Sequence, residues 1–96
     1  MIRVHLTRSP MLSKKYRVRF VDEKRHVDFG ARGYSDYTIH KDDDRRALYL
    51  KRHRVHENWN DVYTAGFWAR WLLWEKKTIK EAKTAMSKRF GIRFLP

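Results

Sequence analysis

The sequence has 96 residues, enough for one small domain (residues 1–96), and its 23 lysines and arginines exceed its 11 acidic residues to leave a formal net charge of +12. A domain this basic is expected to have an anionic partner, most often nucleic acid, with an acidic protein surface or an anionic membrane as the alternatives. The chain has no cysteine, which excludes disulfides and thiolate metal sites, and its first residues lack a signal-peptide core, so we expect that it is not secreted.

The positive charge lies towards both ends of the chain. Residues 1–41 and 75–93 carry nearly all of the excess, whereas residues 58–74 are neutral. Both basic segments also have regular hydrophobic patterns, which a disordered basic tail would lack. We therefore expect the charge to lie on folded surfaces around a neutral, aromatic middle.

Apolar and polar residues alternate in the first third of the chain, as is typical of strands. This pattern predicts a strand over residues 2–7 and a second over residues 15–20, with one aromatic and aliphatic face and one all-cationic face. Residues 26–29 are expected to return as the antiparallel partner of the second strand. Residues 37–39 are predicted to be either a short strand or an extended lead-in to a helix.

Two helices are predicted from their start and stop signals. Asp42 is expected to be the N-cap of a peripheral, weakly amphipathic helix over roughly residues 42–55. Thr78 and Glu81 have the spacing of a capping box, and Gly91 lies where a helix that begins there is expected to end.

A third helix is predicted between these two, over about residues 64–75. The stretch Thr64–Trp74 holds three of the four tryptophans and a single charge, Arg70. A helix that is apolar on nearly all sides is normally buried. Its apolar run is shorter than the roughly 20 residues that cross a bilayer, so we expect a core helix and no membrane partner.

These elements predict an α+β fold. An N-terminal antiparallel β-hairpin or small sheet precedes three α-helices, and the central helix (about 64–75) is aromatic and buried. Residues 92–94 are predicted to add a last short strand.

Several strings of residues carry a family resemblance. The longest is Gly-Tyr-Ser-Asp-Tyr-Thr-Ile-His at residues 33–40, and Glu57-Asn58-Trp59 and the aromatic stretch add to it. From Phe29 onward, over about two thirds of the chain, the sequence resembles a family of small basic proteins of unknown function encoded by large nucleocytoplasmic DNA viruses, the giant viruses. The resemblance implies a viral origin and a place in the virion or in the infected host cell, in its cytoplasm or nucleus. It implies no activity and no cofactor.

Two basic surfaces are candidates for nucleic-acid binding. The first is the cationic face of the second strand, with Lys15, Arg17 and Arg19, because alternate strand residues lie about 6.6 Å apart, close to the spacing of phosphates along one DNA strand. The second is the face of the last helix that follows Thr78; its members are Lys80, Lys83 and Lys88. The alternative for both is an ordinary solvated surface.

Three further side chains are singled out by their surroundings in the sequence. Tyr34, on a glycine-flanked loop, either stacks on a nucleic-acid base or packs on the aromatic helix. Asp36 is expected to bond to the backbone of its own turn. Arg70 is expected to form a structural ion pair with Asp36, Asp61 or an aspartate of residues 42–44; the alternative is that it faces a partner.

No enzyme or metal site is predicted. His53 and His56 lie on one side of a helix end, with Glu57 next to them, but a metal site needs a third ligand, and known zinc patterns place the glutamate differently relative to the histidines. A cationic helix end explains the histidines. Three consecutive aspartates, residues 42–44, diverge around a helix and cannot converge on one ion. The histidine spacing does not match a histidine–metal nuclease, so we expect no cofactor.

The sequence thus favours a non-enzymatic DNA-binding protein of a large DNA virus, either packaged in the particle with other virion proteins or acting in the infected cell. It would contact the phosphate backbone through its basic strand and helix faces with little sequence readout. The alternative is a minor structural protein of the capsid or inner particle that binds acidic protein surfaces. Trp59 or Trp74 at the surface would favour that alternative. The oligomeric state is left open.

Overall fold

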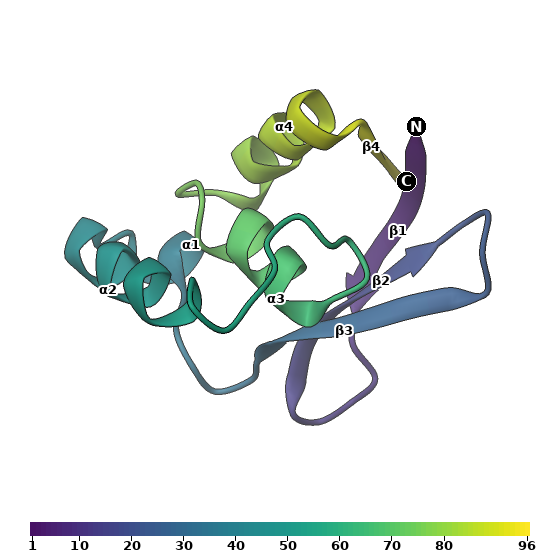
Figure 1. Cartoon of the computed structure of the whole chain (residues 1–96). Helices are drawn as coiled ribbons and strands as arrows, with labels where there is room; N and C mark the ends of the chain where they lie inside the picture. Colours follow the sequence, from purple (N-terminus) through teal and green to yellow (C-terminus); the bar gives the residue numbers. More distant parts are fainter.

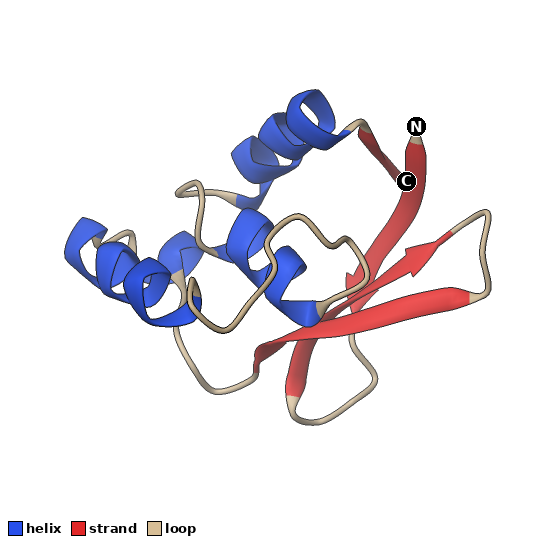
Figure 2. Ribbon diagram, in the orientation of Figure 1, coloured by secondary structure: helices blue, strands red, loops and turns tan.

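A four-stranded mixed sheet forms one layer of the protein, and the helices gather on one side of it (Figures 1 and 2). The computed structural model describes all residues from Met1 to Pro96. The strands lie in the order β3-β2-β1-β4. Their bounds are Ile2–Arg8 for β1, Lys14–Phe20 for β2, Arg25–Ala31 for β3 and Ile92–Leu95 for β4.

The first three strands form an antiparallel meander, as their alternating pattern predicts. Val4 lies opposite Phe20 on β1 and β2, and Val18 lies opposite Val27 on β2 and β3. The predicted hairpin is therefore confirmed. The last strand, β4, pairs in parallel with β1, with Ile2 opposite Ile92, and so brings the two ends of the chain side by side (Figure 1).

Residues 37–40 form a single helical turn, α1 (Tyr37–His40), so the prediction of a strand or extended segment there is wrong. The Asp36 carboxylate caps this turn by accepting a hydrogen bond from the Thr38 backbone N–H at 2.9 Å. Such local capping stabilises a turn that the hydrophobic pattern does not indicate. The next helix, α2 (Asp43–His53), begins at the predicted N-cap Asp42.

The aromatic segment is helical and buried, as predicted, but not as one uniform α-helix. It begins at Thr64 as a short α-helix, α3 (Ala65–Trp68), and continues as a π-helical turn, η1 (Ala69–Leu73). Most of its large side chains are fully buried and form the centre of the core. The last helix, α4 (Ile79–Phe90), follows it and packs against η1.

The ends of α4 match their sequence signals. The Thr78 hydroxyl accepts a hydrogen bond from the Glu81 backbone N–H at 3.1 Å, and Gly91 takes a positive φ of 66° where the helix ends. This left-handed residue turns the chain back so that β4 can pair with β1. None of the helices has the length and apolarity that crossing a bilayer requires.

We expect Thr78→Ala to lower the free energy of unfolding by about 1 kcal/mol, because the substitution removes the N-cap hydrogen bond of α4. Urea denaturation followed by circular dichroism measures the change. Ser87→Ala is the matched control, since the Ser87 hydroxyl lies on the same helix, is exposed and caps nothing. Equal stability of the two variants would contradict this account of the helix start.

Candidate nucleic-acid interface

The cationic face of β2 is largely neutralised by neighbouring carboxylates. Arg17 lies opposite Asp28 of β3, and its guanidinium donates two hydrogen bonds to that carboxylate, at 2.9 and 3.1 Å. The Ser9 hydroxyl donates a third, at 2.6 Å. The bonds from Arg17 hold the pKa of Asp28 below its ordinary value despite partial burial.

Lys15, near the start of β2, also forms an ion pair. Its ammonium lies 2.6 Å from a carboxylate oxygen of Asp36, and both side chains are mostly buried. Asp36 thus bonds to its own turn, as predicted, and in addition holds Lys15. Of the three cations expected to form one free surface, only Arg19 is exposed without an acidic partner.

The second candidate surface keeps its charge. None of the lysines and arginines from Lys76 to Arg93 forms an ion pair. The two acidic residues nearby do not compensate for them, because Glu75 is engaged by Arg46 and Arg70, and Glu81 is needed at the start of α4. The surface around α4 is therefore positively charged.

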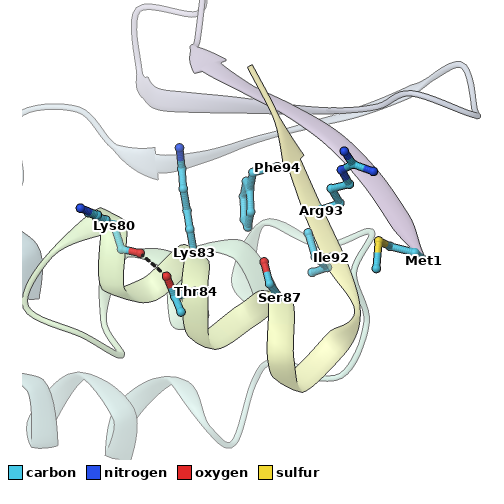
Figure 3. A pocket seen from close by; sticks show the side chains of 8 residues that line it. All are labelled: Met1, Lys80, Lys83, Thr84, Ser87, Ile92, Arg93 and Phe94. Carbon is cyan, nitrogen blue, oxygen red and sulfur yellow. Dashed lines mark hydrogen bonds between the residues drawn. The ribbon is translucent and has the colours of Figure 1, made fainter.

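A groove of about 590 Å³, the basic groove, runs between α4 and β4 (Figure 3). Lys83 and Phe94 stand next to each other in it, with the lysine nitrogen 5.5 Å from the centre of the ring. The Ser87 hydroxyl faces the groove without a hydrogen-bond partner of its own. The groove is lined by Met1, Lys80, Lys83, Thr84, Ser87, Ile92, Arg93 and Phe94.

The three predicted lysines of α4 do not all line this groove. Lys80 and Lys83 do, whereas Lys88 lines a neighbouring depression that shares Lys80 and Thr84 with the groove. The basic surface therefore continues around the helix. Arg93 was not among the predicted residues, because its place beside α4 depends on the chain reversal at Gly91 and on the pairing of β4 with β1.

Arg70 is buried, with 9% of its surface exposed, and forms a structural ion pair, but not with any of the predicted aspartates. Its guanidinium donates to Glu75 at 2.9 Å and lies over the rings of Trp59 and Trp71, 5.0 and 4.2 Å from their centres. Arg46 of α2 binds the same carboxylate. The prediction of Asp36, Asp61 or residues 42–44 as its partner is wrong, because Glu75, which lies just beyond the end of η1, is the carboxylate within reach of Arg70.

The two tyrosines of the loop after β3 differ in their surroundings. Tyr34 is 75% exposed, so it does not pack on the aromatic segment. Tyr37 is buried, and its hydroxyl donates to Asp43. Trp59 and Trp74 are partly buried, so neither forms an exposed tryptophan patch.

The histidines at the end of α2 do not form a metal site. The Nδ1 atom of His53 lies 2.9 Å from Glu57. The His56 side chain is exposed and bonds to neither, and only its backbone N–H donates to the His53 carbonyl, at 3.0 Å. No group of three or more histidine, aspartate or glutamate side chains converges anywhere in the protein with the geometry of a metal site.

Comparison with known proteins gives one match. Residues 4–53 match the model of a family of unknown function (DUF5754). No curated protein and no solved structure matches the chain. The matched region runs from β1 to the end of α2. It therefore includes the N-terminal strands, which lie outside the resemblance to the viral proteins described above. It stops before the aromatic segment, which is part of that resemblance.

We expect Glu75→Gln to lower the stability at neutral pH by roughly 1–2 kcal/mol, less than for a fully buried pair because the carboxylate is partly exposed. Burial alone raises the pKa of Glu75, but bonding to Arg70 and Arg46 outweighs it and leaves the pKa below the ordinary 4.5. The contribution of Glu75 is therefore present above pH 4.5 and is lost as the pH falls further.

Urea denaturation between about pH 3 and 7 measures this effect. The variant should lose less stability on acidification than the parent protein. Asp44→Asn, which removes an exposed carboxylate with no side-chain partner, is the control and should keep the acid sensitivity of the parent. An unchanged pH profile in Glu75→Gln would contradict the assignment.

We expect Arg17→Gln to lower the urea midpoint, because it leaves the Asp28 carboxylate without its main partner. Arg19→Gln, two residues along the same face, should leave the midpoint unchanged, since Arg19 is exposed and unpaired. Equal midpoints for the two variants would show that the Arg17–Asp28 pair does not contribute to folding.

Proposed function

The chain belongs to the family of unknown function (DUF5754), and we propose that it is a non-enzymatic nucleic-acid-binding protein that holds the phosphate backbone in the basic groove and on the adjoining surface of α4. The observation that carries the proposal is the concentration of unpaired cations around one helix. A protein with a net charge of +12 has enough acidic residues to neutralise some of its surfaces, and here none of them pairs with the cations of α4.

The chemistry of the groove suits a phosphodiester backbone. Lys80 and Lys83 supply ammonium groups from α4, and Ser87 adds a hydroxyl that can donate to a phosphate oxygen. The ring of Phe94 offers an apolar surface to a sugar. Contacts of this kind bind any sequence, so we expect little base specificity from the groove.

The strand face contributes less to this function than its sequence suggests. Lys15 and Arg17 are held by Asp36 and Asp28, so binding a phosphate there would compete with ion pairs already formed. Arg19 remains as a peripheral contact.

We also propose that the partner is DNA and that the protein is encoded by a large nucleocytoplasmic DNA virus, acting in the virion or in the infected host cell. The resemblance of the residue 33–40 string and of the aromatic segment to small basic proteins of giant viruses supports this origin. Isolation of the protein from its source, followed by assay for DNA and for capsid shell in the same fractions, tests this part of the proposal.

A second candidate function is a minor structural role in the capsid or inner particle, through binding to an acidic protein surface. Exposed apolar side chains of α2 and of the turn after it favour it: Leu48 and Val55 are exposed, and the cations Lys51, Arg52 and Arg54 lie close to them in the sequence. Ile39 of α1 is exposed as well. Exposed apolar groups with a polar rim are typical of a protein interaction site.

A salt titration tests the proposed function. If the protein contacts about four phosphates, affinity for a DNA duplex should fall about a hundredfold between roughly 50 and 200 mM salt. Lys80→Gln, Lys83→Gln and Lys88→Gln combined should weaken binding and reduce the slope of log Kd against log salt by roughly 2–3. Fluorescence anisotropy with a labelled duplex measures both quantities.

The matched control is Lys51→Gln, Arg52→Gln and Arg54→Gln combined, which removes the same charge from the far end of α2. It should leave the slope nearly unchanged. Equal slopes for the two triple variants would mean that only net charge matters, and affinity that is insensitive to salt would contradict phosphate binding altogether.

A further inference from the structure

A second cleft, the aromatic cleft, lies between the loop after β3, helix α2 and the start of the aromatic segment. Its volume is about 320 Å³, the size of a small-ligand pocket. It brings together residues from separate parts of the sequence: Tyr34 from the residue 33–40 string, Tyr49 from α2, Glu57 from the following turn and Gly66 from α3.

Tyr49 gives the cleft an unused hydrogen-bonding group. Only 9% of its surface is exposed, and its ring stacks between Trp74 and His53, with centres 4.0 and 4.1 Å away. Its hydroxyl has no partner within the protein. The fully buried side-chain polar atoms without a partner belong to His40 and Arg70, so the Tyr49 hydroxyl keeps some access to solvent, and Tyr49 is one of the residues that line the cleft.

The Tyr49 hydroxyl is also fixed in its chemical state. Burial raises the pKa of Tyr49 well above its ordinary value, so the hydroxyl stays neutral at any physiological pH. A neutral phenol can both donate and accept a hydrogen bond, and its ring cannot move freely between two stacked neighbours.

Glu57 is held in place within the same cleft. Its two carboxylate oxygens each lie 2.9 Å from a nitrogen, one of the His53 ring and one of the Trp59 ring. The carboxylate packs directly on Gly66, where a Cβ atom would come within 2.8 Å of the Glu57 carboxyl carbon. The absence of a side chain at Gly66 therefore allows the Glu57 carboxylate to lie against the wall of the cleft.

The charges of the cleft argue against a phosphate ligand. Lys15 is the only lysine or arginine that lines it, and its ammonium is paired with Asp36 at 2.6 Å. Glu57 leaves the lining without an excess of positive charge. In a protein this basic, the cleft is thus a place suited to an uncharged ligand.

The shape of the cleft suits a flat ring. Gly66, Ala65 and Ala69 present almost no side chain on one wall, which leaves a shallow apolar surface. Tyr34 also lines the cleft, is largely exposed and stacks on no other ring of the protein. Base–aromatic stacking contributes about 1–3 kcal/mol per base in nucleic-acid complexes.

We propose that the aromatic cleft binds a nucleobase, which stacks on Tyr34 and forms hydrogen bonds along its edge with the Tyr49 hydroxyl and the Glu57 carboxylate. In its choice of ligand this inference rests on the nucleic-acid-binding function proposed above, which it extends from the phosphate backbone to the base. The base comes either from a single-stranded nucleic acid or from a free nucleoside.

The test uses the full chain labelled with ¹⁵N and each of the common nucleosides in turn. NMR titrations should show saturable shifts of the backbone amides of residues 34–36, 49, 57 and 66. Tyr49→Phe keeps the stacked ring but removes the hydroxyl, and should weaken binding about three- to tenfold, the equivalent of one neutral hydrogen bond. Tyr16→Phe is the matched control, because Tyr16 belongs to β2, does not line the cleft, and its hydroxyl also has no partner.

Tyr49→Phe should fold normally, since no hydrogen bond is lost, and its Tm checks this. Glu57→Gln offers a second variant that keeps the size of the side chain and changes its charge. Absence of saturable shifts at these residues for every nucleoside, or equal weakening by Tyr49→Phe and Tyr16→Phe, would overturn the inference. Much tighter binding of nucleoside monophosphates than of nucleosides would also overturn it, because it would make phosphate the recognised group.

Single-stranded oligonucleotides with and without bases distinguish the two sources. Displacement of the nucleoside by the normal strand but not by an abasic strand assigns the base to a nucleic acid, and displacement by neither assigns it to a free nucleoside; both support the inference. If the protein binds DNA but no nucleoside, only the proposal of a nucleobase site in the aromatic cleft is refuted. If the protein binds nucleosides but shows no salt-dependent binding to DNA, only the proposal of phosphate binding in the basic groove is refuted.

Discussion

The packing of Trp68 is the constraint on which the rest of the structure depends. Its indole is fully buried and donates to the Val62 carbonyl at 2.7 Å. Its ring lies about 6 Å from those of Phe20, Phe29 and Phe94, which come from β2, β3 and β4. One side chain thus ties three strands to the aromatic segment. Because β4 is among them, Trp68 also helps to position the wall of the basic groove opposite α4.

The distribution of carboxylates decides which basic surface is free. Asp28 and Asp36 neutralise two cations of β2, and Glu75 is shared by Arg46 and Arg70. Two of them, Lys15–Asp36 and Arg46–Glu75, connect elements that are distant in the sequence, so they act as structural contacts within the fold. The cations of α4 receive no such partner. Their mutual repulsion is a cost to the folded state that an anionic ligand would relieve.

The two proposed sites complement each other in chemistry. The basic groove has unpaired cations and an apolar floor, whereas the aromatic cleft has a paired lysine, a carboxylate and an unused phenol. The aromatic segment joins them, because Gly66 lines the cleft and Trp68 packs against Phe94, which lines the groove. A change in the packing of α3 would therefore affect both sites.

The sequence by itself determined the features that depend on neighbouring residues: the alternating strands β1 to β3, the caps Asp42 and Thr78, and the end of α4 at Gly91. It also indicated that Arg70 would be buried and paired. Only the tertiary structure decided its partner, the neutralisation of Lys15 and Arg17, and the parallel pairing of β4 with β1. The physical reason is that a charge pairs with whichever acceptor the fold brings near it, and a cleft is formed by side chains from elements that local periodicity cannot place together.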